Sequence, residues 1–202
     1  MKQLQILASC LCILFAMNVN ADTPVEVKLI APIEEDRGWC LDLRGRMNNA
    51  APVGGVHGHT CDTYSGNGPI VDQAFSMENI QEENIFRLIA FKDKCLTLYE
   101  PNEGSFVSME TCDGRDTQAI MMNESGQIIP EMTPKLCLTA GSVVLPGGGG
   151  DPLHLMRDIS FEACDSDINE RQLWEFRAAW NGPEKTTAER PYDVNPEGRF
   201  GN

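Results

Sequence analysis

The chain repeats one order of cysteine, leucine and glutamine three times. The clearest copy starts with Cys95-Leu96-Thr97-Leu98, continues as an alternating run to Cys112, and ends with Gln118. The same order starts at Cys40 and again at Cys137. A period of roughly 40 residues predicts one structural unit used three times. We call the copies repeat one, repeat two and repeat three, at about residues 25–80, 81–124 and 125–178.

Residues 1–21 have the features of a secretory signal peptide. Lys2 gives a short positive region, residues 6–17 form an apolar run, and Val19-Asn20-Ala21 is a small-residue cleavage site. The run is shorter than the roughly 20 residues that span a bilayer. Leu7-Ala8-Ser9-Cys10 is an alternative lipoprotein signal, although the apolar run continues beyond Cys10. We therefore expect a secreted or periplasmic chain.

The repeats contain six of the eight cysteines, two in each copy. In an exported chain such cysteines indicate disulfides rather than metal ligation. Because every copy holds its own pair at the same two positions, the repeat favours pairing within copies: Cys40–Cys61, Cys95–Cys112 and Cys137–Cys164. Each disulfide is expected to add roughly 3 kcal/mol by restricting the unfolded chain.

The chain is strongly acidic, with a formal net charge of −14 at pH 7. Such a surface repels phosphates, which argues against nucleic acid and anionic membranes as partners. We also expect no membrane insertion, and solubility outside the cell is the simplest meaning of the charge.

Short alternating runs separated by turn residues predict an all-β fold, a barrel or a sandwich. No stretch shows a sustained helical period. The expected strands include residues 25–30, 39–43, 56–61, 71–77 and 85–91, and residues 145–152 are expected to form a flexible loop. Residues 22–180 would form one domain, and residues 181–202 look like an irregular tail.

The repeated residues resemble the ricin-type β-trefoil lectins. The resemblance rests on Cys40-Leu41-Asp42-Leu43, a later Cys61-Asp62 and a closing Gln172-Leu173-Trp174, each with counterparts in the other copies. It covers about residues 25–178 and implies a β-trefoil with pseudo-threefold symmetry. It also implies that the last apolar residues of the copies meet in one core: Phe75, Ile120 and Trp174. The glutamines Gln73, Gln118 and Gln172 would then satisfy backbone groups, because buried polar groups need partners.

The resemblance implies a sugar site at four positions of a repeat. A carboxylate two places after the first cysteine accepts hydroxyl hydrogen bonds, and an aromatic ring two places before the second packs on the sugar's C–H face. Polar residues complete the set. In repeat one these positions are Asp42, His59, His57 and Asp72. The other copies lack both the aspartate and the ring, with Thr97, Ser108, Glu110 and Thr117 in repeat two, and Thr139, Ser160, Glu162 and Arg171 in repeat three. Only repeat one could bind a galactose-type sugar or glycoconjugate in this manner.

Other interpretations of repeat one stay open. His59 is a smaller platform than a Trp or Tyr, and Tyr64 or Trp39 could supply the missing aromatic face. Asp42 could instead cap a turn while the histidines are solvated. The four side chains also suit Zn²⁺ as ligands, but His-x-His alone is a weak pattern, and we predict no metal and no cofactor. His154 looks isolated.

Catalytic motifs are absent from the sequence. There is no Gly-x-Ser-x-Gly, no His-Glu-x-x-His and no phosphate-binding glycine loop, since Gly147-Gly148-Gly149-Gly150 lacks the Lys and Ser/Thr of a P-loop. We therefore expect no enzyme. The leading interpretation is a secreted, lectin-like protein with at most one sugar site, in repeat one. The alternative is a β-trefoil interaction module or toxin-associated subunit, with degenerate sugar sites and a partner protein.

Overall fold

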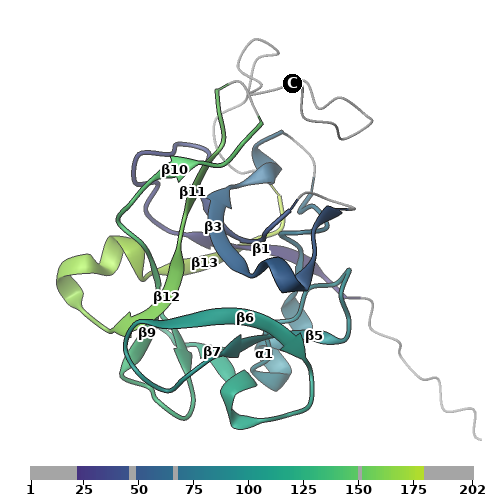
Figure 1. Ribbon diagram of the computed structural model, residues 1–202, viewed down its shortest axis with the longest axis vertical. Coiled ribbons are helices and arrows are strands. Elements are labelled where there is room, and N and C mark those ends of the chain that lie inside the picture. Colours follow the sequence, from purple (N-terminus) through teal and green to yellow (C-terminus); the bar gives the residue numbers. More distant parts are fainter. Residues whose placement is uncertain (1–21, 46–48, 66–67, 150–151, 180–202) are drawn as a thin grey trace, which may run out of the picture.

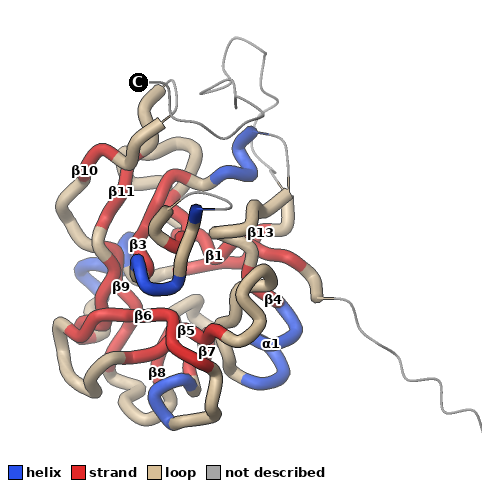
Figure 2. Tube along the Cα trace, turned by 45° about the vertical axis from the view of Figure 1, so that its right-hand side comes forward, coloured by secondary structure: helices blue, strands red, loops and turns tan. Residues whose placement is uncertain are grey.

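The computed structural model describes residues 22–45, 49–65, 68–149 and 152–179. The expected signal peptide and C-terminal tail lie outside these residues. Short strands joined by turns make up most of the described chain (Figure 2). None of its described helices is long and apolar enough to cross a membrane.

The described strands form three antiparallel sheets (Figure 1). Their bounds are β1 Pro24–Leu29, β2 Trp39–Leu43, β3 Val56–Thr60, β4 Phe75–Ser76, β5 Lys94–Leu98, β6 Ser105–Thr111, β7 Ile120–Met122, β8 Ile128–Pro130, β9 Leu136–Ala140, β10 Leu145–Pro146, β11 Leu155–Arg157, β12 Ile159–Ala163 and β13 Trp174–Arg177. A seven-stranded sheet follows the order β10-β11-β3-β2-β1-β13, with β4 also paired to β1. A four-stranded sheet follows β5-β6-β12-β9, and β7 pairs with β8.

The two ends of the described fold are joined by β1 and β13. Glu26 lies opposite Arg177, and Leu29 lies opposite Trp174. Arg177 forms an ion pair with Glu26 at 2.9 Å, and both side chains are buried. Glu26 also accepts hydrogen bonds from the backbone N–H and the hydroxyl of Thr63. A buried carboxylate needs such partners, so this cluster fixes the first strand, the last strand and repeat one together.

One hydrophobic core runs through all three repeats. Phe75, Ile120 and Trp174 all lie in this core and are at most 1% exposed. The indole of Trp174 donates a hydrogen bond to the carbonyl of Leu138 at 2.9 Å. Trp174 therefore buries its ring without leaving its N–H unsatisfied.

The structure corrects two of the strand predictions. Residues 71–77 contain only the short strand β4, which leads directly into the helix α1, Met77–Glu83. Ser76 caps this helix by accepting a hydrogen bond from the Asn79 N–H, and Asn84 ends it in the left-handed conformation. Residues 85–91 form isolated bridges, Phe75–Leu88 and Arg87–Cys95, rather than a strand. The described fold is mostly β.

Three disulfides link the strands, Cys40–Cys61, Cys95–Cys112 and Cys137–Cys164, and these are the pairs expected from the cysteine spacing. The Cα atoms of each pair lie 5.0–5.1 Å apart, within the usual range for a disulfide. Disulfides of this kind are typical of an oxidising compartment, extracellular or periplasmic.

The three buried glutamines make the same hydrogen bonds in their three places. Each side-chain carbonyl accepts from the backbone N–H that follows the second cysteine: Asp62, Asp113 or Asp165. Each amide donates to the carbonyl that precedes this cysteine: Thr60, Thr111 or Ala163. The amide also donates to the side chain two places after the first cysteine: Asp42, Thr97 or Thr139. Each glutamine thus joins the two ends of its disulfide-closed segment.

Candidate functional site

The predicted sugar-site residues of repeat one lie together. Strands β2 and β3 pair so that Asp42 lies opposite His57 and Cys40 lies opposite His59. Residues two apart on a strand share a face, so both imidazoles lie on the side of the Asp42 carboxylate. Nε2 of His57 lies 3.4 Å from Oδ1 of Asp42, and Nδ1 of His59 lies 3.6 Å from Oδ2.

Burial distinguishes this cluster from an open sugar site. Asp42 is 3% exposed and Asp72 is 2% exposed. Oδ2 of Asp42 accepts a 2.6 Å hydrogen bond from Nε2 of Gln73. Carboxylate oxygens of Asp42, Asp62 and Asp72 lie within 4.8 Å of one another. In this arrangement the Asp42 carboxyl accepts a hydrogen bond inside the protein. The histidines, rather than Asp42, line the pocket that a ligand would enter.

The environment keeps the Asp42 carboxyl and the two imidazoles largely uncharged at neutral pH. Burial raises the pKa of Asp42 to about 8, and the neighbouring Asp72 adds to this rise. Burial lowers the pKa of His57 to about 4 and also lowers the pKa of His59. Nδ1 of His57 is buried with no hydrogen-bond partner among the described residues.

A hairpin from repeat three covers this face of repeat one (Figure 1). Strand β11 pairs with β3, which sets Met156 opposite His59. The His154 ring packs edge-on against the His59 ring, with centroids 5.0 Å apart. Residues 145–152 were expected to form a flexible loop, but residues 145–146 pair with β11 as strand β10. His154 is likewise not isolated but a buried part of this contact.

A pocket of about 300 Å³ remains beside the covered cluster, and we call it the repeat-one pocket. Its lining comprises Arg44, Gly45, Asn49, His57, His59, Gly147 and Met156. Gly147 approaches His59 so closely that a Cβ at this position would lie 2.7 Å from Nε2. The pocket therefore presents two imidazoles, a guanidinium and an amide.

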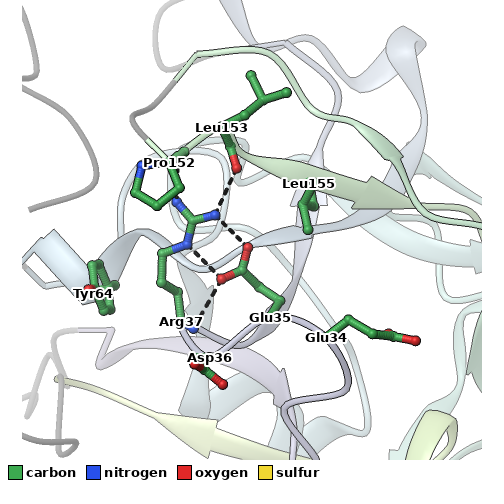
Figure 3. A pocket seen from close by; sticks show the side chains of 8 residues that line it. All are labelled: Glu34, Glu35, Asp36, Arg37, Tyr64, Pro152, Leu153 and Leu155. Atoms are coloured by element: carbon green, nitrogen blue, oxygen red, sulfur yellow. Dashed lines mark hydrogen bonds and ion pairs between the residues drawn. The ribbon is translucent and has the colours of Figure 1, made fainter. Parts of the chain in front are cut away.

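The two other aromatic candidates lie elsewhere. Trp39 is fully buried, with its indole N–H bonded to the Ile33 carbonyl at 2.6 Å and the Arg157 guanidinium 4.4 Å from its ring centroid. It cannot act as a sugar platform. Tyr64 lines a separate pocket of about 700 Å³, together with residues 34–37, Pro152, Leu153 and Leu155 (Figure 3).

The zinc interpretation gains no support from the described part of the chain. The groups there whose ligand atoms lie within 4.8 Å of one another are Asp42–Asp62–Asp72 and Glu26–Cys40–Cys61. Neither group contains a histidine. Cys40 and Cys61 are joined in a disulfide, so they supply no thiolate for a metal.

Repeats two and three have threonine in place of Asp42. Thr97 and Thr139 are buried, accept a hydrogen bond from their glutamine and donate one to a cysteine carbonyl. Their hydroxyls are therefore occupied. Two further candidate positions, Ser108 and Glu110, line a third pocket of about 490 Å³.

Solved structures of β-trefoil lectins resemble this fold. The β-trefoil lectin of the Vibrio vulnificus hemolysin/cytolysin, with N-acetyl-D-lactosamine bound, matches with a TM-score of 0.52 and 17% identity over 81% of this chain and 99% of that one. The C-half of an earthworm R-type lectin in complex with GalNAc matches with a TM-score of 0.50 and 14% identity, over 77% and 98%. The agglutinin from Abrus precatorius matches with a TM-score of 0.50 and 12% identity, over 79% of this chain and 48% of that one.

These similarities establish a β-trefoil fold for the described chain, since identities this low carry the fold alone. The chain spans about half of the Abrus agglutinin chain and nearly all of the other two. No protein-family model and no curated protein match the sequence.

Proposed function

We propose that this β-trefoil is a secreted, non-catalytic carbohydrate-binding protein whose sugar site is the repeat-one pocket. The observation that carries the proposal is the pocket of about 300 Å³ lined by both His57 and His59. Sugar-sized ligands occupy concave sites of this order, about 300 Å³ and upward. Residues 22–180 are taken as one ricin-type domain that follows a signal peptide, in keeping with the disulfides.

The chemistry of the pocket suits a neutral, galactose-type sugar. The imidazole of His59 offers a ring face for a C–H surface, while Arg44 and Asn49 offer N–H donors to hydroxyl oxygens. Asp42 does not line the pocket. Its carboxyl contacts His57 and Gln73 and holds the His57 ring in place. One shallow site makes few contacts, so the affinity should be weak, about millimolar or roughly −4 kcal/mol. Several copies held together would supply avidity.

The solved lectins support the choice of probes. Two of them carry N-acetyl-D-lactosamine and GalNAc, so both sugars are suitable for a titration followed by amide chemical shifts. We expect shifts at Arg44, His57 and Gly147, and loss of these shifts in His59→Ala. Glu162→Ala, at the corresponding position of repeat three, is the control and should bind like the wild type. Shifts at these three residues that survive His59→Ala but are lost in Glu162→Ala would contradict the proposal.

A second candidate is a protein-interaction module with no active sugar site. The 3% exposure of Asp42 favours it, because a carboxyl committed to Gln73 is withdrawn from ligands. If a broad glycan array and both titrations fail with correctly folded protein, this second function replaces the first.

A further inference from the structure

The pocket lined by Tyr64 is the largest of the three pockets described above and shares no lining residue with the repeat-one pocket. We call it the Tyr64 pocket. Three segments that are distant in the sequence form it: the turn between β1 and β2, the 3-10 turn that follows Cys61, and the repeat-three hairpin (Figure 3). Its volume of about 700 Å³ lies within the range typical of small-molecule sites, about 300–1,000 Å³.

The floor of the Tyr64 pocket is a rigid ion pair. Nε and one terminal nitrogen of Arg37 donate to the two carboxylate oxygens of Glu35 at 2.6 and 2.5 Å. The same guanidinium donates to the carbonyls of Pro152 and Leu153 at 2.9 and 2.8 Å. Both side chains are buried. These bonds fix the guanidinium and leave one N–H without a partner among the described residues.

The rim of the pocket carries carboxylates. Asp36 is exposed and makes no hydrogen bond or ion pair with another described side chain, so its carboxylate can accept hydrogen bonds from a ligand. Glu34 is also exposed at the rim, where it pairs with Arg157. The rim carboxylates repel anions at short range, and the Arg37–Glu35 pair on the floor is neutral overall. An uncharged, hydroxyl-rich ligand avoids this repulsion and still finds hydrogen-bond donors and acceptors.

The walls of the pocket supply an apolar surface. Tyr64 lies on one side of Arg37 and Pro152 and Leu153 on another (Figure 3). Leu153 is 47% exposed, which leaves apolar surface open to a ligand. A tyrosine ring and a free carboxylate that line one pocket can together bind a sugar, because the ring packs on C–H groups and the carboxylate accepts from hydroxyls.

We infer that the Tyr64 pocket is a second carbohydrate-binding site, specific for neutral sugars, in which Tyr64 is the stacking platform and Asp36 the hydroxyl acceptor. It is separate from the repeat-one pocket, so the inference does not depend on sugar binding there. The N–H of Arg37 that remains free donates to a sugar oxygen. Because the repeat-three hairpin forms one wall, the site depends on the position of Pro152 and Leu153 rather than on a cysteine-repeat position.

The test is a lactose titration of the full chain, followed by backbone amide chemical shifts. We expect shifts at residues 35–37, Tyr64 and Leu153. Tyr64→Ala should weaken binding at this pocket about tenfold or more, which corresponds to about 1.4 kcal/mol. Tyr64→Phe should retain it, because the ring remains, and Asp36→Asn should weaken it. Tyr99→Ala and Asp116→Asn, both exposed elsewhere, are the matched controls and should change nothing.

The outcomes separate the two sites. Shifts around Tyr64 that persist in His59→Ala support the inference even if the repeat-one pocket never responds. Shifts confined to the repeat-one pocket at saturating lactose overturn it and leave the proposed function intact. No shift at either pocket overturns both. Equal binding by Tyr64→Ala, Tyr64→Phe and wild type would also overturn it, because the ring would then contribute nothing.

Discussion

Gln73 donates a 2.6 Å hydrogen bond from its amide to Oδ2 of Asp42, and both side chains are buried. The corresponding glutamines donate to the hydroxyls of Thr97 and Thr139. Asp42 therefore occupies a structural position that a threonine fills in the other repeats. The same carboxyl that suggests a sugar site from the sequence is also an interior hydrogen-bond acceptor.

This relationship predicts that Asp42→Thr preserves the fold. A threonine hydroxyl can accept from Gln73 and donate to the Cys40 carbonyl, as Thr97 does to Cys95. The free energy of unfolding, measured in urea, should stay the same or rise, because the substitution removes a buried carboxyl. Gln73→Ala should instead lose about 1–3 kcal/mol, since it leaves buried groups unsatisfied. A large loss in Asp42→Thr would show that the carboxyl makes contacts that a hydroxyl cannot replace.

The pKa of Asp42 predicts how stability depends on pH. Its carboxyl titrates at about 8 in the folded chain and near 3.8 when exposed, so the folded state binds more protons between these values and stability falls as pH rises. The pKa of His57 is lowered to about 4, so between about 4 and 6.5 this imidazole acts in the opposite direction, and the lowered pKa of His59 acts in the same sense as that of His57. Above pH 6.5 the Asp42 effect remains.

We therefore expect the melting temperature to fall between pH 6.5 and 8. Asp42→Thr should flatten this part of the curve. A wild-type melting temperature that is constant or rises across this range would contradict the neutral, buried carboxyl.

Trp174 is predicted to be a structural residue with no part in binding. Trp174→Ala removes a fully buried ring and the hydrogen bond to Leu138, and should cost about 3–5 kcal/mol in urea unfolding. Tyr99→Ala removes a ring that is 69% exposed and should change stability by less than about 0.5 kcal/mol. A loss of sugar binding in Trp174→Ala at unchanged stability would place the indole in a site.

The ion pair between Glu35 and Arg37 is predicted to hold the repeat-three hairpin in place. Arg37→Met leaves the Glu35 carboxylate buried and unpaired and removes the bonds to the Pro152 and Leu153 carbonyls. Removing one partner of a buried pair costs about 3–5 kcal/mol. Amide exchange at Leu155 and Met156 should also become faster.

Arg115→Met is the matched control. Arg115 pairs with Asp113 at 2.7 Å, but the two side chains are 46% and 48% exposed. Exposed pairs contribute about 0–1 kcal/mol. Equal losses in Arg37→Met and Arg115→Met would mean that the buried pair does not hold the hairpin.

The sequence predicted the features that depend on local, repeated residues. The cysteine pairs and the glutamines recur in the same order in each copy, so the role of a residue in one copy predicts the role of its counterparts in the others. The helix α1 was missed because its seven residues are too few to show a helical period; its signals were the cap Ser76 and the left-handed Asn84.

The environment of Asp42 could not be predicted from repeat one, because the chain that covers it belongs to repeat three. Residues 145–152 have no counterpart in the other copies. The strand that follows them, β11, pairs with β3 and brings together residues about a hundred positions apart. For the same reason His154 seemed isolated. The role of Arg37 could not be predicted either, since nothing local shows that its guanidinium binds carbonyls of the hairpin.

The close approach of Gly147 to His59 gives the last prediction. A Cβ at position 147 would lie 2.7 Å from Nε2 of His59 and 3.1 Å from the His154 carbonyl carbon, so Gly147→Ala must displace the imidazole or the hairpin. Overpacking of this kind costs about 1–3 kcal/mol. Because the same imidazole lines the repeat-one pocket, binding of N-acetyl-D-lactosamine should weaken more than the stability loss alone explains. Gly68→Ala is the control, since a Cβ there would meet no atom within 4 Å. Wild-type binding by a destabilised Gly147→Ala protein would show that the sugar does not contact His59.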